Sequence, residues 1–171
     1  MKKLILYLSI FFVASVTHGQ VKVEALAGGS NFYGMSLNTA FNIPLSEDND
    51  HLIVPVIGLG MLLPFWDVPK CIIHSGLNYS YKKYGLGTEI SGFINSPFWK
   101  KNEVVSNDFV NMIVYPNANY NFPIKEKWYL GISAGAYFAF SKQYNYEQNS
   151  HRIRFEGDVI PGAGLSFGYK L

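Results

Sequence analysis

Residues 127–142, KWYLGISAGAYFAFSK, alternate strictly in character, and no other feature of the sequence constrains the fold as strongly. Every second residue from Trp128 to Phe140 is apolar, whereas the intervening residues are small, hydroxylated or tyrosine. Successive side chains of a β-strand point to opposite faces. The pattern therefore predicts a long strand with one apolar face and one face of small and polar residues.

The same period of two recurs along the chain, interrupted by polar or turn-like segments. We predict eight strands, at residues 21–31, 35–45, 51–65, 71–83, 86–94, 110–124, 127–142 and 159–171. Turns are expected at 46–50 and 125–127, and longer polar loops at 95–108 and 143–158. Strands joined in sequence by mostly short connections predict an all-β, antiparallel, up-and-down barrel of eight strands.

The size of the side chains indicates which face of the barrel lies inside. An eight-stranded barrel has an interior only wide enough for side chains. The polar face of the last two strands is rich in glycine and serine, whereas the opposite face carries Trp, Phe and Leu. We therefore predict a transmembrane barrel, with apolar residues facing lipid and polar residues facing the lumen. The alternative is a soluble periplasmic barrel, similar to a lipocalin, whose apolar residues point inward.

This orientation assigns individual residues to the two faces. The predicted lipid-facing residues are Trp128, Leu130, Ile132, Phe138, Phe140, Leu165, Phe167 and Tyr169. The predicted polar network of the lumen comprises Lys22, Glu24, His74, Asn78, Glu89, Asn117, Asn119 and Lys170, and Lys82 is expected to be a further interior charge. Because a buried charge must be paired or hydrated, we expect salt bridges among these groups.

The first twenty residues, MKKLILYLSIFFVASVTHGQ, have the layout of a secretory signal peptide. Lys2 and Lys3 precede an apolar run that is too short to span a membrane as a helix, and small residues follow it. We predict a signal peptide at residues 1–19 and a single outer-membrane barrel domain at residues 20–171.

Composition excludes several classes of function. The chain has 14 Lys and Arg against 12 Asp and Glu, and two of the lysines lie in the predicted signal peptide, so a nucleic-acid partner is not expected. The single cysteine, Cys71, cannot form an intramolecular disulfide and is interpreted as a small apolar residue. We find no spacing typical of metal ligands and no phosphate-binding loop, so no metal and no cofactor are expected.

Two passages resemble the small outer-membrane β-barrel proteins of Gram-negative bacteria, the porin-like superfamily that includes the transmembrane domain of outer-membrane protein A. The passage NFPIKEKWYLGISAGAYFAF is similar to the penultimate hairpin of that group. The C-terminal GAGLSFGYKL is similar to the alternating end that the assembly machinery recognises, with Phe167, Tyr169 and Leu171 as the insertion signal. Leu171 departs from the commonest pattern, which ends in Phe. The resemblance implies the fold and an outer-membrane location but no single activity.

We expect a monomer with a structural or surface-interaction role carried by its outer loops, in contact with outer-membrane lipid and lipopolysaccharide. One alternative is a narrow porin-like channel, although interior tyrosines at 115, 129 and 137 leave little bore. Another is a lipid-modifying enzyme, with His74, Ser75 and Glu89, or Ser150, His151 and Glu156, as candidate groups. Neighbouring strand residues such as His74 and Ser75 point to opposite faces, so they cannot act as a pair without a bulge. We therefore expect no catalytic residues.

Overall fold

A computed structural model describes residues 20–62, 70–95, 110–145 and 150–171, and these residues form strands, tight turns and one short 3-10 helix. The strands are β1 (Gln20–Gly28), β2 (Gly34–Pro44), β3 (His51–Leu62), β4 (Lys70–Tyr81), β5 (Tyr84–Asn95), β6 (Val110–Pro123), β7 (Trp128–Asn145) and β8 (Ser150–Lys170), and the 3-10 helix is η1 (Gly29–Asn31). The described residues contain no helix that is long and apolar enough to cross a membrane.

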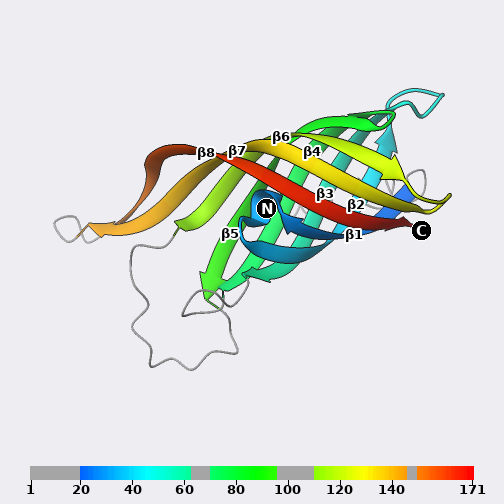
Figure 1. The fold of residues 1–171 in the computed structure, drawn as a ribbon. Coiled ribbons are helices and arrows are strands. Elements are labelled where there is room, and N and C mark those ends of the chain that lie inside the picture. Colours follow the sequence, from blue (N-terminus) through cyan, green and yellow to red (C-terminus); the bar gives the residue numbers. More distant parts are fainter. Residues whose placement is uncertain (1–19, 63–69, 96–109, 146–149) are drawn as a thin grey trace, which may run out of the picture.

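The eight strands form a closed barrel in which each strand pairs with its neighbours in sequence (Figure 1). The pairing of β1 with β8 closes the barrel, from Lys22 opposite Lys170 to Gly28 opposite Gly164. Every pairing is antiparallel, so the predicted all-β, up-and-down barrel of eight strands is confirmed. Closure leaves no free edge where the strands overlap, which satisfies the backbone hydrogen bonds of all eight.

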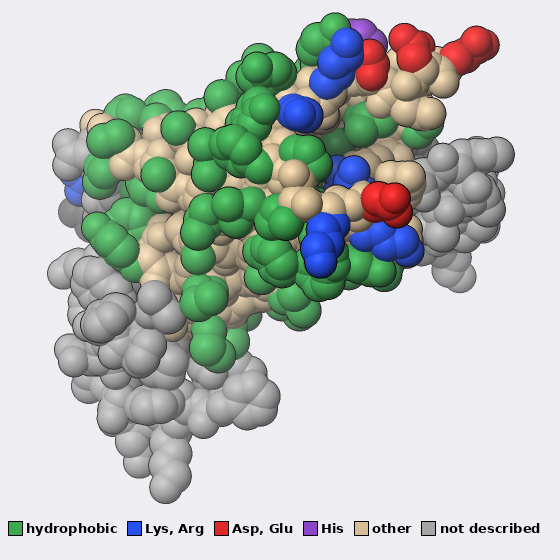
Figure 2. All heavy atoms as spheres, turned by 45° about the vertical axis from the view of Figure 1, so that its right-hand side comes forward, with side chains coloured by type: hydrophobic (Ala, Val, Ile, Leu, Met, Phe, Trp, Pro, Cys, Tyr) green, Lys and Arg blue, Asp and Glu red, His purple; other side chains and the backbone are tan. Residues whose placement is uncertain are grey.

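The two faces of the barrel differ in the way that the alternation predicts. Large apolar side chains are exposed on the outside of β2 to β8, for example Leu37, Leu59, Leu77, Leu86, Phe122, Ile132 and Leu165. Polar side chains are buried inside, among them Asn38, His74, Ser91, Asn117 and Ser166. Figure 2 shows the apolar side chains along the wall of the barrel and charged side chains gathered toward one end. Gly58 and Gly60 of β3 share the inner face with Val54 and Val56, and a Cβ at either glycine would clash with β2.

The two ends of the barrel are built differently. We call the end with the turns at 45–50, 82–83 and 124–127 the turn end, and the opposite end, where β1 meets η1 and β7 meets β8, the loop end. The first and last strands begin and finish at the turn end. The predicted loop at 95–108 lies mainly outside the described residues, and the predicted signal peptide lies outside them entirely.

The predicted loop at 143–158 is wrong for most of its length. β7 continues to Asn145 and β8 begins at Ser150, so the two strands form a hairpin that reaches beyond the other strands at the loop end (Figure 1). The hairpin is paired from Phe140 opposite Phe155 to Asn145 opposite Ser150. The ring of Phe155 lies 5.4 Å from that of Phe140 and 6.2 Å from that of Phe138, so aromatic contacts support this polar stretch.

The prediction that Lys82 is an interior charge is also wrong. Lys82 lies in the two-residue turn between β4 and β5, has a positive φ of 55°, and is exposed. Its ammonium group forms an ion pair with Asp50 at 3.3 Å. The hydrogen bond with Asp50 and the charge of that carboxylate raise the pKa of Lys82. The alternation of β4 therefore ends at Tyr81, because a tight turn does not continue the period of two.

Candidate functional site

The lumen contains the candidate site, and its most distinctive part is a plug formed by the connection between β1 and β2. This connection turns inward as η1 and lies close to β1, β2 and β4 to β8. Ser30 and Asn31 are fully buried. Asn31 donates hydrogen bonds from Nδ2 to the Ser36 hydroxyl, at 2.7 Å, and to the carbonyl of Leu26, at 3.4 Å. The first loop of the barrel is therefore folded into the interior.

Glycines make this inward turn possible. Gly28 and Gly29 have φ values of 68° and 55°, in the left-handed region that glycine adopts without steric cost. A Cβ at Gly28 would also lie 2.7 Å from the carbonyl oxygen of Ala163 in β8. On the facing strand, a Cβ at Gly164 would lie 2.9 Å from both N and Cα of Gly29. The plug and β8 thus meet backbone to backbone, with glycine on each side.

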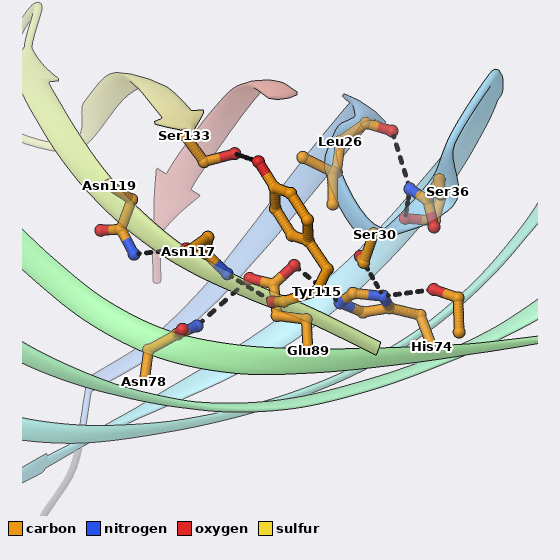
Figure 3. Close-up of polar contacts among 12 residues, drawn as sticks. Leu26, Ser30, Ser36, His74, Asn78, Glu89, Tyr115, Asn117, Asn119 and Ser133 are labelled. Atoms are coloured by element: carbon orange, nitrogen blue, oxygen red, sulfur yellow. Dashed lines mark hydrogen bonds and ion pairs between the residues drawn. The ribbon is translucent and has the colours of Figure 1, made fainter. Parts of the chain in front are cut away.

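His74 of β4 connects the plug to the wall of the barrel (Figure 3). Its Nδ1 lies 2.9 Å from the hydroxyl of Ser30 and 3.1 Å from that of Ser91 in β5. Its Nε2 lies 3.9 Å from a carboxylate oxygen of Glu89 and makes no hydrogen bond with another described residue. His74 is 1% exposed, so these hydroxyls replace the water that the ring would otherwise bind.

A second group of polar side chains continues from Glu89 across the lumen (Figure 3). Asn78 donates to the Glu89 carboxylate at 3.3 Å, Asn119 donates to the side-chain oxygen of Asn117 at 3.3 Å, and Asn117 donates to the carbonyl of Tyr115 at 3.2 Å. The Tyr115 hydroxyl donates to the carbonyl of Gly162 in β8 at 3.2 Å. The polar groups therefore link β4, β5 and β6 to β8.

An apolar cluster closes the lumen above the plug, toward the loop end. Its buried members are Leu62, Ile72, Phe93, Ile113, Tyr115 and Tyr137, and Phe32 packs against them. The Tyr137 ring lies 5.2 Å from that of Tyr115 and 5.3 Å from that of Phe32. With η1 beside this cluster, the described side chains fill the bore in this half of the barrel.

The other half of the lumen is hollow. A cavity of about 60 Å³ lies beside Glu24, Glu89 and Asn78, with room for a few water molecules. It adjoins a larger space of about 480 Å³ at the turn end, which we call the vestibule. Lys22 and Tyr129 line both spaces. Tyr129 donates to the Glu24 carboxylate at 2.9 Å, and the Lys22 ammonium group lies 5.3 Å from the centre of the Tyr129 ring.

Glycines on one strand make room for larger polar or aromatic side chains on the next. Gly168 of β8 lies opposite Tyr129, and a Cβ there would clash with the tyrosine ring. Gly87 of β5 lies opposite Asn78, and a Cβ there would clash with the asparagine amide. Because each of these glycines faces a large side chain, the inner face is rich in glycine and the interior is still filled.

Ser30, His74 and Glu89 have the residue types of a nucleophile, a base and an orienting acid, but their geometry does not support catalysis. Ser30 and His74 have almost no accessible surface, so a substrate cannot reach the hydroxyl in this arrangement. The 3.9 Å separation of His74 from Glu89 exceeds a hydrogen bond. Ser75 is exposed on the outside of β4, on the opposite face from His74. We interpret the group as a hydrogen-bonding network that holds the plug.

The second candidate set, Ser150, His151 and Glu156, lies on β8 beyond the overlap with β1, and its side chains are outside the described part of the chain. No group of three or more His, Cys, Asp or Glu side chains that could hold a metal ion occurs within the described ranges. Cys71 of β4 is half-buried and forms no disulfide, and its backbone takes part in the strand pairing of the barrel wall.

The residues predicted for the lumen extend from the plug to the turn end. His74, Asn78, Glu89, Asn117 and Asn119 lie on the side of the plug, and Lys22 and Lys170 line the vestibule. Glu24 lies between them, beside the small cavity that Asn78 and Glu89 also line. The residues predicted to face lipid lie on the outside of the barrel, where Trp128 stacks on Phe167 at 5.0 Å and contacts Tyr169 at 4.7 Å. The outer face of β7 and β8 also carries Leu130, Ile132, Phe138, Phe140 and Leu165. Leu171 directly follows β8.

Sequence reasoning missed the plug residues Ser30 and Asn31. The signal available was the run Gly28-Gly29-Ser30-Asn31, in which the alternation of β1 stops before the predicted strand end. That run indicates a turn but not the direction of the turn, which depends on Gly164, far away in the sequence.

Comparison with known proteins found no family model, no curated protein and no solved structure that matches the chain.

Proposed function

We propose that this protein is an outer-membrane β-barrel with a structural or surface-interaction role, and that it works without conducting solutes and without catalysis. The observation that carries the proposal is the inverted distribution of side chains, apolar on the outside and polar within. Soluble monomers rarely expose contiguous apolar patches above a few hundred Å². A bilayer, in contrast, favours closed barrels with an apolar outer belt and a polar interior.

The filled lumen supports the structural role over the channel. The plug and the apolar cluster occupy the loop-end half, where Tyr115, Ile72 and Ser30 have no accessible surface. A path from the vestibule would have to pass these residues. The β7–β8 hairpin, which reaches beyond the other strands, supports a role in surface contacts, with Ile153 and Phe155 exposed on it.

The membrane location is tested by introducing the same charge at two depths of the outer face. Ile57 lies near the middle of β3, and Ile124 lies in the turn between β6 and β7; both are about half exposed. In a membrane barrel, Ile57→Arg should cost about 2–4 kcal/mol and Ile124→Arg about 0–1 kcal/mol, because the cost of a charge falls toward the interface. Folding into phospholipid vesicles, followed by the heat-dependent mobility of the folded barrel on a denaturing gel, measures the difference.

A soluble barrel gives a different result. The wild-type chain would then be released by osmotic shock without detergent, and both arginine variants would fold equally well in buffer. A channel is tested by planar-bilayer recordings of the purified chain, for which we expect no unitary conductance steps. Steps that persist in independent preparations would contradict the structural role and favour the porin-like alternative.

A further inference from the structure

We propose that the vestibule at the turn end is a binding site for a small phosphorylated molecule, a phosphate monoester of about the size of a sugar phosphate. This inference depends on the fold of the barrel and goes beyond the proposed role, because it assigns a ligand site to the end of the barrel opposite the plug. It holds whether the loop end acts in surface contacts or not.

The charge of the vestibule is the first argument. Its lining includes Lys22, Lys82, Lys83 and Lys170, and none of its described lining residues is an Asp or a Glu. Lys82 is already paired with Asp50. Within the described residues, Lys22, Lys83 and Lys170 have no ion pair within 4.0 Å. Three lysines without a close ion pair around one space favour an anion there.

The position of Lys22 is the second argument. It lies on the inner face of β1 between the vestibule and the smaller cavity. The nearest carboxylate in sequence, Glu24, accepts a hydrogen bond from Tyr129 instead of forming an ion pair with Lys22. The ammonium group lies over the face of the Tyr129 ring and has no ion pair within 4.0 Å among the described residues, which leaves its hydrogen atoms available to an oxyanion. Lysine binds phosphate as a point charge with three donors.

The size and the other lining groups are the third argument. A volume of about 480 Å³ lies within the range of small-molecule sites, about 300–1,000 Å³. Asn42, Asn121 and Ser80 line the same space and offer amide and hydroxyl groups for the hydroxyls of a sugar. The mouth is formed by exposed turn residues such as Lys83 and Asn49, so a ligand can enter from solution.

Calorimetric titration of the full folded chain in a zwitterionic detergent tests the proposal. The probes are glucose 6-phosphate, inorganic phosphate, succinate and glucose, at constant ionic strength set with chloride. We expect glucose 6-phosphate to bind more tightly than inorganic phosphate, and glucose and succinate not to bind measurably. The double variant Lys22→Gln, Lys170→Gln should weaken the binding of glucose 6-phosphate by at least about tenfold, because charged hydrogen bonds are lost.

The matched control is the double variant Lys125→Gln, Lys127→Gln, which removes the same charge from the turn between β6 and β7, outside the lining of the vestibule. Its affinity for glucose 6-phosphate should stay within about twofold of the wild type, as expected for exposed charges that do not touch a ligand. Heat-dependent gel mobility establishes that each variant is folded.

Several outcomes would overturn the proposal: no heat of binding for either phosphate probe, equal losses in the two double variants, or binding of succinate as tight as that of glucose 6-phosphate. A lipid source of the phosphate is distinguished by adding short-chain phosphatidic acid. If that lipid binds and glucose 6-phosphate does not, the ligand is a lipid headgroup, and the assignment to a soluble phosphate monoester is wrong.

Discussion

The two halves of the lumen differ in how much of their space side chains occupy. Toward the loop end, the plug, His74 and the apolar cluster fill the interior with buried side chains. Toward the turn end, Lys22, Lys83 and Lys170 border an open space in which the described residues offer no counter-charge within ion-pair distance. The difference indicates that the filled half supplies stability and that the open half is available for a ligand.

The largest loss of stability is expected from a substitution in the filled half. Tyr115 is fully buried in the apolar cluster and also donates to Gly162, so Tyr115→Ala should lower the free energy of unfolding by about 4 kcal/mol, from a cavity that neighbouring side chains cannot fill. Tyr129→Ala is the matched change in the open half and should cost clearly less, because water from the vestibule can occupy the space. Urea unfolding in phospholipid vesicles, followed by tryptophan fluorescence, compares the two variants. Equal losses would remove the distinction between the halves.

The next effect concerns the seat of the plug. In Gly164→Val, the new side chain would meet backbone atoms of Gly29 at 2.9 Å and the Ser133 hydroxyl at 2.6 Å, so the plug has to move. Such overpacking should cost about 2–3 kcal/mol, although valine otherwise favours a strand. Gly92→Val on β5 is the control, because no atom lies within 4 Å of a Cβ there. The same urea titration applies, and a Gly92→Val loss as large as that of Gly164→Val would argue against a tightly seated plug.

The smallest effect is expected at the rim of the open half. Lys82 and Asp50 form an exposed ion pair, and side chains of this kind contribute little because water screens them. Lys82→Ala should therefore leave the urea midpoint unchanged within error. A clear fall in the midpoint would show that the turn end also depends on its charges for stability, and would weaken the contrast with the filled half.

The strands and their faces could be predicted from the sequence because burial on one side imposes a period of two. In β3 both faces are apolar, so alternation does not assign its faces, and the structure places Gly58 and Gly60 on the inner side. The predicted loop at 143–158 was wrong because this segment is mostly polar and alternates only briefly, from Arg152 to Phe155. Its pairing follows from the strands that lead into it.

The plug could not be predicted because its contacts join distant parts of the chain. Ser30 and His74 are 44 residues apart, and neither residue alone is unusual in a barrel. The positions of the lumen charges along the barrel axis could not be predicted either. Alternation predicts that Lys22, Glu24 and Lys170 point inward, but their height along the barrel follows from the strand register, which pairs Lys22 with Lys170.

The location of the plug has a consequence for the order of assembly. Gly29 follows β1 directly, and Gly164 lies in β8, so the contact between them spans the seam at which the first and last strands join. Gly28 and Gly164 are also partners in that pairing, so the plug can make this contact only once β1 and β8 lie side by side. The burial of Ser30 and Asn31 against β8 is therefore coupled to the closure of the barrel.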